Sequence, residues 1–215
     1  CFVLTDGKNY INLPIAKDYK KIGEGDTGLN TGGMGAISPV PFVSKVFKNK
    51  IDKEIIKPTI KGLNKEKIPF RGFLFIGLIK VKDKPKVIEY NVRMGDPETE
   101  VVLPRIKNDF GEILTSLVTN QLKFVKMDFS IDSVATIVSV SQGYPEKYQK
   151  GKEIKGLDEN TESIIFHCGT IKSSKKVFTN GGRVLAVTSF GKDFKLALSK
   201  SYSVIKNIKY EGIYY

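Results

Sequence analysis

The sequence has few of the residues that build disulfide frameworks, metal clusters or membrane spans. Its 215 residues include two cysteines, Cys1 and Cys168, and one histidine, His167. Such a set forms neither a disulfide framework nor a zinc site. No apolar run approaches the length of a transmembrane helix, and no basic-then-apolar leader follows Cys1. We therefore expect a soluble protein from the reducing cytoplasm, and, because the first residue is not methionine, an excerpt of a longer chain.

Arginine is also scarce, although the chain is basic. The net charge is +12, yet only four of the 35 basic residues are arginine. Nucleic-acid interfaces cluster Lys and Arg in patches or stripes. The lysines here are spread along the whole chain, which is typical of a solvated surface. We expect no nucleic-acid partner and no membrane partner, and we keep a lysine-rich RNA- or protein-binding module as an alternative.

Residues 1–126 are predicted to form the first of two α+β pieces. Residues 1–13 are typical of a short hairpin, whereas residues 22–35 contain six glycines and predict a loop. Apolar residues recur at helical spacing over residues 43–63, with Pro58 as a kink or boundary near the end. Further elements are expected as strands 73–81 and 86–92, a helical stretch from Pro97 to Leu103 and an amphipathic helix at 110–122.

Residues 127–215 are predicted to form the second piece. The polar and aperiodic residues 123–132 are expected to link the two. Strand patterns and a closing amphipathic helix follow. The strands are expected at residues 134–141, 162–171 and 177–191, and the helix at residues 193–208.

Three polar residues, Glu89, Asn91 and Arg93, occupy every second position of the strand that begins at residue 86. Alternation in a strand places them on one face. A carboxylate and an amide oxygen suit Mg²⁺, and an Arg fork suits phosphate. A solvent-facing strand with an ordinary Glu–Arg contact is an equally good interpretation of the spacing alone. The intervening apolar residues are expected to face the core: Ile88, Tyr90 and Val92.

Two further segments are candidate binding elements. The glycine-rich segment can form a nest of backbone N–H groups for an anion, to which Asp26, Asn30 and Thr31 could add contacts. It matches neither the Walker pattern nor the dinucleotide fingerprint. The turn Asp96–Glu98 places two carboxylates at the end of the polar strand, and Pro97 stiffens it. Mobile glycine turns and acidic turns are also common without any ligand.

Three other residues have chemistry of their own. His167 lies in an apolar strand, where a hydrogen-bonded core imidazole is commoner than a catalytic base. Cys168 beside it is expected to pack rather than to act as a nucleophile. Arg183 follows two glycines at the start of a strand, where it could reach a ligand or make a surface ion pair.

Six segments of the chain form a recognisable set: NTGGMGAISP at 30–39, GFLFIGL at 72–78, KVIEYNVRMGDPE at 86–98, GYP at 143–145, FHCGT at 166–170 and TNGGRVLAVT at 179–188. In this order they resemble the glycinamide ribonucleotide synthetase (phosphoribosylamine–glycine ligase) family of ATP-grasp enzymes of purine biosynthesis. The resemblance covers essentially the whole chain. The chain departs from the family's QDHKR segment at residues 17–21, and at Leu29, Met94 and Glu100.

The resemblance implies the second part of an ATP-grasp domain in residues 1–126 and the synthetase's carboxy-terminal domain in residues 127–215. It implies ATP and Mg²⁺ or Mn²⁺ as cofactors, glycine and 5-phosphoribosylamine as substrates, and a glycyl phosphate intermediate. Glu89 and Asn91 would bind the metal, and Arg93 would be the catalytic phosphate clamp. The implied substrate-binding residues are Asp18, Asp26, Asn30, Thr31, Gly32, Gly33, Met34, Gly35, Asp96, Pro97, Glu98 and Arg183.

The resemblance also implies that the family's amino-terminal half, with part of the nucleotide clamp, is missing. We therefore expect this chain to be inactive alone and to need that half as a partner. Another ATP-grasp carboxylate–amine ligase is the alternative within enzymes.

Overall fold

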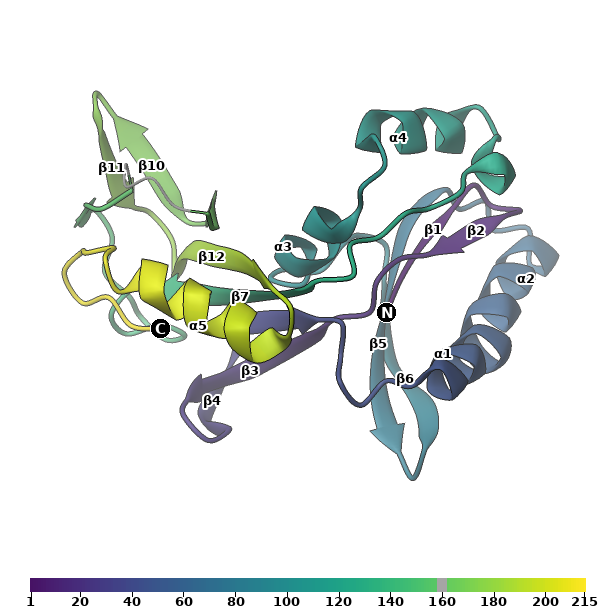
Figure 1. Cartoon of the computed structure of the whole chain (residues 1–215), viewed down its shortest axis with the longest axis horizontal. Helices are drawn as coiled ribbons and strands as arrows, with labels where there is room; N and C mark the ends of the chain where they lie inside the picture. The colour runs from purple at the N-terminus through teal and green to yellow at the C-terminus, as the bar shows by residue number, and fades with distance from the viewer. Residues whose placement is uncertain (158–161) are drawn as a thin grey trace. The chain divides into compact units, whose positions relative to one another are not determined.

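The computed structural model describes residues 1–157 and 162–215, which form two compact units (Figure 1). The first combines Cys1–Ile15, Pro39–Gly95 and Arg105–Ser130, and the second combines Ala16–Ser38, Asp96–Pro104 and Ile131–Tyr215. Each unit is α+β, as predicted. Contacts thus group the chain into interleaved segments, and the domain boundary at residue 126 stays a prediction. No helix in the described residues is long and apolar enough to cross a membrane.

Unit 1 is built on an antiparallel sheet of four strands in the order β2-β1-β5-β6. The two predicted hairpins are confirmed, because β1 pairs with β2 and β5 pairs with β6. The strands are β1 (Phe2–Thr5), β2 (Tyr10–Asn12), β5 (Gly72–Val81) and β6 (Lys84–Asn91). The helices are α1 (Lys45–Ile51), the π-helical segment η1 (Asp52–Ile56), α2 (Lys57–Lys65), α4 (Phe110–Val118) and the short 3₁₀ turn η3 (Leu122–Phe124).

Apolar residues cover both faces of this sheet. On one face, Val3 and Ile76 pack with residues of α1, η1 and α2, such as Ile51 and Ile56. On the other face, Leu4 packs with Ile113 and its neighbours in and after α4. Figure 1 shows α1 and α2 along one side of the strands. The core therefore lies around the inner strands β1 and β5.

The predicted helix over residues 43–63 is confirmed with an internal irregularity. Ser44 caps it by accepting a hydrogen bond from the Phe47 backbone N–H at 3.1 Å. The π-helical segment η1 ends just before Pro58, which lies in the first turn of α2. Proline has no N–H for the helical ladder and clashes with the carbonyl four residues earlier, so a local change of helical period accommodates it.

Unit 2 contains a five-stranded sheet, β3-β4-β7-β12-β9, and a three-stranded sheet, β10-β11-β8. Helix α5 (Phe194–Ile205) packs on β7 and β12, and its Ile205 joins Val187 and Leu185 in the core. The strands are β3 (Lys17–Gly23), β4 (Thr27–Ser38), β7 (Ser133–Val140), β8 (Glu153–Ile154), β9 (Ile164–His167), β10 (Thr170–Ser173), β11 (Lys176–Thr179) and β12 (Arg183–Gly191). The unit also holds α3 (Thr99–Val102), and the 3₁₀ turn η2 (Leu103–Arg105) starts in it.

The strand stretches expected in this unit are subdivided. Residues 162–171 give the strands β9 and β10, and residues 177–191 give β11 and β12, which belong to different sheets. Glycines lie where each stretch changes sheet, and a Cβ on Gly169 would lie 2.6 Å from the Gly181 Cα. Two chain segments cross closely there, which requires small residues.

The predicted loop at residues 22–35 is wrong for most of its length. Residues 27–38 form β4, which pairs with β3 on one side and β7 on the other. A Cβ on Gly35 would lie 2.6 Å from the Thr136 carbonyl oxygen, and Gly33 has a φ of +129° beside Pro97. The glycines are therefore explained by close approach of neighbouring segments, not by an irregular loop.

Gly35→Ala is expected to lower the stability of unit 2 by about 1–3 kcal/mol, because the added methyl group collides with backbone. Gly62→Ala is the matched control, since a Cβ there meets no atom within 4 Å on helix α2. Gly62→Ala is expected to raise the free energy of unfolding by about 0.5–1 kcal/mol, because alanine favours a helix more than glycine does. Urea unfolding followed by circular dichroism measures both. An unchanged midpoint for Gly35→Ala would contradict the close approach.

Candidate functional site

Glu89 and Asn91 of β6 and Arg93 just after it lie together on one face of unit 1, as predicted, and we call these three residues the β6 row. The Asn91 Nδ2 donates a hydrogen bond to the Glu89 Oε1 at 3.1 Å. The Arg93 guanidinium donates to the Asn91 Oδ1 at 3.4 Å and to the Met94 carbonyl at 2.9 Å. Strand pairing places Glu89 opposite Gly77 and Asn91 opposite Phe75. A Cβ on Gly77 would come within 3.0 Å of the Glu89 Cγ, so glycine leaves room for that side chain.

The apolar residues between them are not packed in the core as expected, although Tyr90 points to the helix-covered face, where its hydroxyl lies 2.9 Å from the Thr59 Oγ1 of α2. Ile88, Tyr90 and Val92 have exposed fractions of 65%, 49% and 73%. β6 is the edge strand, whereas the buried cluster under α1 and α2 is centred on the inner strands. The register also shifts between Gly77 and Leu78, which leaves Ile88 without a paired residue. An edge position and a bulge therefore outweigh the alternation seen in the sequence.

The β6 row fits a hard divalent cation that takes few protein ligands. Glu89 offers carboxylate oxygens and Asn91 an amide oxygen, and the two side chains are in contact through the Asn91 Nδ2. Mg²⁺ is commonly held by one or two carboxylates, with waters and substrate phosphates completing the octahedron. Among the described residues no group of three or more His, Cys, Asp or Glu side chains is placed to hold a metal. A site with two protein ligands of this kind is compatible with that finding.

A second group of predicted residues meets in unit 2, around the Asp96–Glu98 turn. The Arg183 Nη1 donates to the Asp96 carbonyl at 2.7 Å and lies 3.0 Å from its carboxylate Oδ1. The guanidinium also fills the space over Gly32, where a Cβ would lie 2.9 Å from its Cζ. Pro97 packs in the same way against Gly33. Arg183 thus ties the acidic turn to the glycine-rich strand.

Two carboxyls in and just after this turn, those of Glu98 and Glu100, are withdrawn from water, whereas that of Asp96 is exposed. Glu98 is 4% exposed, and burial together with the charge of Asp18 raises its pKa. Burial, with smaller contributions from Asp96 and Glu98, raises the pKa of Glu100 to about 7. Asp18 itself forms an ion pair with Lys20. Glu100 was missed as a site residue because only its position in α3 shows that its carboxyl is withdrawn from water.

The glycine-rich strand does not offer the open nest of donors that the sequence indicated. The Gly32 N–H donates to the Tyr144 hydroxyl and the Gly33 N–H to the Thr31 Oγ1, both at 2.9 Å. Met34 packs in a buried cluster with Val138 and Ala186. These groups are occupied within the protein.

The remaining predicted residues of this segment lie at or near the β3–β4 connection. Asp26 lies between the two strands with a φ of +62°, and Asn30 is paired with Lys21 in the strand register. Both are exposed. Substrate binding by these residues stays a prediction.

The structure contradicts the prediction for His167 and agrees with the prediction for Cys168. His167 is hydrogen-bonded, with its Nδ1 2.9 Å from the Thr170 Oγ1, but it is exposed, because β9 is an edge strand. The core imidazole expected from the sequence is therefore wrong. Burial raises the pKa of the Cys168 thiol to about 12, so it stays protonated at neutral pH, as expected of a packed cysteine.

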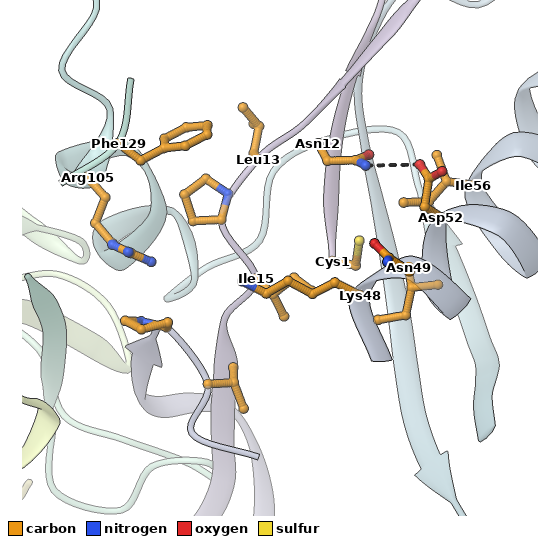
Figure 2. A pocket seen from close by; sticks show the side chains of 14 residues that line it. Cys1, Asn12, Leu13, Ile15, Lys48, Asn49, Asp52, Ile56, Arg105 and Phe129 are labelled. Atoms are coloured by element: carbon orange, nitrogen blue, oxygen red, sulfur yellow. Dashed lines mark hydrogen bonds between the residues drawn. The ribbon is translucent and has the colours of Figure 1, made fainter. Parts of the chain in front are cut away.

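Unit 1 also contains a cavity of about 440 Å³, which none of the predicted site residues lines (Figure 2). The carboxylate among its lining side chains is that of Asp52, which accepts hydrogen bonds from the Tyr10 hydroxyl at 2.7 Å and the Asn12 Nδ2 at 3.0 Å. Lys57 lies 3.1 Å from the same carboxylate. Burial would raise the pKa of Asp52, but these partners lower it. Neighbouring groups of the protein thus already balance the charge of Asp52, which favours a structural role for this carboxylate.

Comparison with known proteins first shows the class of protein to which this fold belongs. Residues 1–99 match the family model described as "Phosphoribosylglycinamide synthetase, ATP-grasp (A) domain", and residues 134–215 match the C domain of the same synthetase. The biotin carboxylase domain of a thermophilic 2-oxoglutarate carboxylase has a similar fold, with a TM-score of 0.67 over 99% of this chain and 46% of that one. At 12% identity this likeness shows the fold alone. The chain has the fold of an ATP-grasp protein.

Closer relatives identify the family. Phosphoribosylamine–glycine ligase of Caldanaerobacter subterraneus is 42% identical over all of this chain and 51% of its own length. The ligase of Vigna unguiculata is 42% identical over 98% of this chain and 70% of its own. The Thermotoga maritima crystal structure is 34% identical, with a TM-score of 0.85 over 100% of this chain and 53% of that one. The chain belongs to the phosphoribosylglycinamide synthetase family, and it spans about half the length of most of these relatives.

Glu100→Gln is expected to make unit 2 more stable at pH 8 than the parent chain while changing little at pH 4. Folding raises the pKa of Glu100 to about 7. The folded state therefore holds the proton more tightly, and stability falls as pH rises from the unfolded pKa through the folded one. The gain is on the order of 1 kcal/mol after allowance for solvent screening.

Urea midpoints at the two pH values measure this effect. Glu146→Gln, at an exposed carboxyl of the same unit, is the matched control and should show no pH-dependent gain. Equal gains for Glu100→Gln at both pH values would contradict a titrating buried carboxyl.

Proposed function

We propose that this chain supplies one half of an enzyme that joins glycine to 5-phosphoribosylamine, with ATP converted to ADP and phosphate. The product is glycinamide ribonucleotide, and the activated form of glycine is glycyl phosphate. The single observation that best supports this is the contacting Glu89–Asn91–Arg93 row in a chain of this family. The relatives named as ligases supply the identity of the reaction.

The proposed roles follow from the chemistry of each side chain. Glu89 and Asn91 would hold Mg²⁺ or Mn²⁺, since both cations favour oxygen ligands. When bound, the cation would neutralise phosphate charge and act as a Lewis acid. Arg93 would hold the phosphoryl oxygens, because a planar guanidinium donates two parallel hydrogen bonds to such groups. It would stabilise charge as the γ-phosphoryl group moves to the glycine carboxylate.

The unit 2 residues are proposed to line the substrate side. Arg183 keeps the Asp96–Glu98 turn against Gly32, which gives this lining a fixed form. The exposed Asp96 carboxylate can then receive the amine of a substrate by charge-assisted hydrogen bonding. Preorganised groups of this kind orient reactants without spending binding energy on loop ordering.

Residues 1–126 are proposed to be the second part of the ATP-grasp domain, and residues 127–215 the carboxy-terminal domain. The amino-terminal half present in longer relatives would complete the nucleotide site. We therefore propose that the 215-residue chain does not catalyse the ligation alone.

The cation site is tested directly on this chain with Mn²⁺. Paramagnetic broadening of backbone NMR signals is expected to centre on residues 89–93, and Glu89→Gln should weaken the effect at least about 10-fold, since it removes the anionic ligand. Glu112→Gln, at an exposed carboxylate on α4 of the same unit, is the matched control. If Glu89→Gln leaves the broadening unchanged, the cation binds at another site.

The reaction is tested on a fusion of this chain to the amino-terminal half of the Caldanaerobacter ligase. ADP formation that requires both glycine and 5-phosphoribosylamine is expected, and Glu89→Gln should reduce kcat by about 100-fold or more. The unfused chain should show none. Ligation by the unfused chain would contradict the need for a second half, whereas salt-sensitive RNA binding without ligation would favour the binding-module alternative.

A further inference from the structure

Glu100 of unit 2 has a carboxyl oxygen for which the fold supplies no partner. Within the described part of the chain, its Oε2 is fully buried and accepts no hydrogen bond. The residue lies in the first turn of α3, which packs on β4, β7 and β12. A buried polar atom without a partner costs free energy in the native state. Its position therefore requires an explanation in terms of function or of a second arrangement.

The cation that acts on the ionisation of Glu100 is Arg183. β4 and β7 carry no titratable side chain, and β12 carries one, that of Arg183. Lys20 of β3 forms its ion pair with Asp18 instead. The other groups that interact with Glu100 are two carboxyls of the turn and one thiol, those of Asp96, Glu98 and Cys168. Arg183 is therefore the counter-ion available to an ionised Glu100.

In the structure, Arg183 contacts Asp96 with one corner of its guanidinium. The Nη1 donates to the Asp96 carbonyl at 2.7 Å and lies 3.0 Å from the carboxylate Oδ1. A guanidinium has five N–H donors, and these two contacts use Nη1 alone. The Nε and Nη2 lie over Gly32, where a Cβ would come within 3.1 Å of each. Glycine at this position leaves the space in which the guanidinium can turn.

We propose that Glu100 is a positioning residue that competes with the Asp96 carboxylate for Arg183. While Glu100 holds a proton, Arg183 stays on both the carbonyl and the carboxylate of Asp96, as in the structure. When Glu100 is ionised, the guanidinium keeps the Asp96 carbonyl and turns toward the Glu100 Oε2. The turn stays in place, and the Asp96 carboxylate is released from its ion pair.

Burial decides this competition in favour of an ionised Glu100. The Asp96 side chain is 52% exposed, so water screens its attraction to Arg183. A buried carboxylate without a counter-ion is far more costly, because it has lost its hydration. Burial also raises the pKa of Glu100 to about 7, so both protonation states are populated at neutral pH. Arg183 therefore changes partner as the pH rises through about 7.

The exchange changes what the Asp96–Glu98 turn can bind. A released Asp96 carboxylate can accept charge-assisted hydrogen bonds from a primary ammonium group, such as that of glycine. This step rests on the proposed function, which makes glycine a substrate. Apparent affinity follows the population of the competent state, and the ionised fraction of Glu100 rises about 10-fold from pH 6 to pH 8. Binding of the ammonium group should follow the same curve.

Carboxyl ¹³C NMR of this chain, without substrates or cations, tests the exchange directly. Asp96→Asn removes the competing charge at nearly constant size, so Arg183 should move to Glu100 and lower its titration midpoint by at least about one pH unit. In an Arg183→Gln background, the same change should have less than about one third of that effect, because no guanidinium is left to transfer. Equal effects in the two backgrounds would show that Asp96 acts through its own charge, and would overturn the proposal.

A second NMR readout leaves both Asp96 and Arg183 intact. In the parent chain, the carboxyl carbon signal of Asp96 should move with a midpoint near pH 7, because it loses the guanidinium there. Glu100→Gln should abolish this movement, and Glu146→Gln, at an exposed carboxyl of the same unit, should not. An Asp96 signal that stays constant from pH 6 to pH 8 in the parent chain would overturn the proposal.

The consequence for the substrate is tested on the fusion to the amino-terminal half of the Caldanaerobacter ligase. KM for glycine should fall about 10-fold from pH 6 to pH 8. Glu100→Gln should hold it near the parent's value at pH 6, and Glu146→Gln should keep the parent's profile. The same pH profile in the parent and in Glu100→Gln would overturn the role in substrate binding. A fusion that fails to ligate glycine would count against the proposed function alone, because the NMR measurements decide the exchange without substrates.

Discussion

Antiparallel backbone pairing decides which side chains share a face, and both groups of candidate residues depend on it. In unit 1 the pairing of β5 with β6 places Glu89 over Gly77 and sets Asn91 and Arg93 beside it. In unit 2 the pairing of β4 with β7 brings the Thr136 carbonyl against Gly35. A one-residue slip in either ladder would turn the polar row or the glycines to the opposite face.

A few charged groups around the Asp96–Glu98 turn shape unit 2, in contrast to the many exposed lysines. Glu98 and Glu100 are withdrawn from water, and Arg183 is held by the Asp96 turn. Exposed ion pairs such as Lys200 with Glu162 contribute little to stability, because water screens them. Burial of a carboxyl changes its protonation near neutral pH instead. The +12 net charge therefore describes the surface, while the properties of the turn arise from its packing.

How far the sequence predicts the structure differs between the two units. Period-two alternation was enough to predict the shared face of Glu89, Asn91 and Arg93, because that property is local to one strand. It could not predict that Tyr90 is half exposed, since exposure depends on which strand lies at the edge. The strand character of residues 27–38 was equally hidden, because glycine has low strand preference and the reason for it is a carbonyl about 100 residues away at Thr136.

The protonation of the buried Glu100 carboxyl is a second property that the sequence alone does not predict. Nothing in residues 96–100 distinguishes one carboxylate from another by spacing. Its raised pKa arises from the packing of α3 against β4 and β7, which are distant in sequence. Local patterns thus identify which groups are available, and long-range packing decides their protonation.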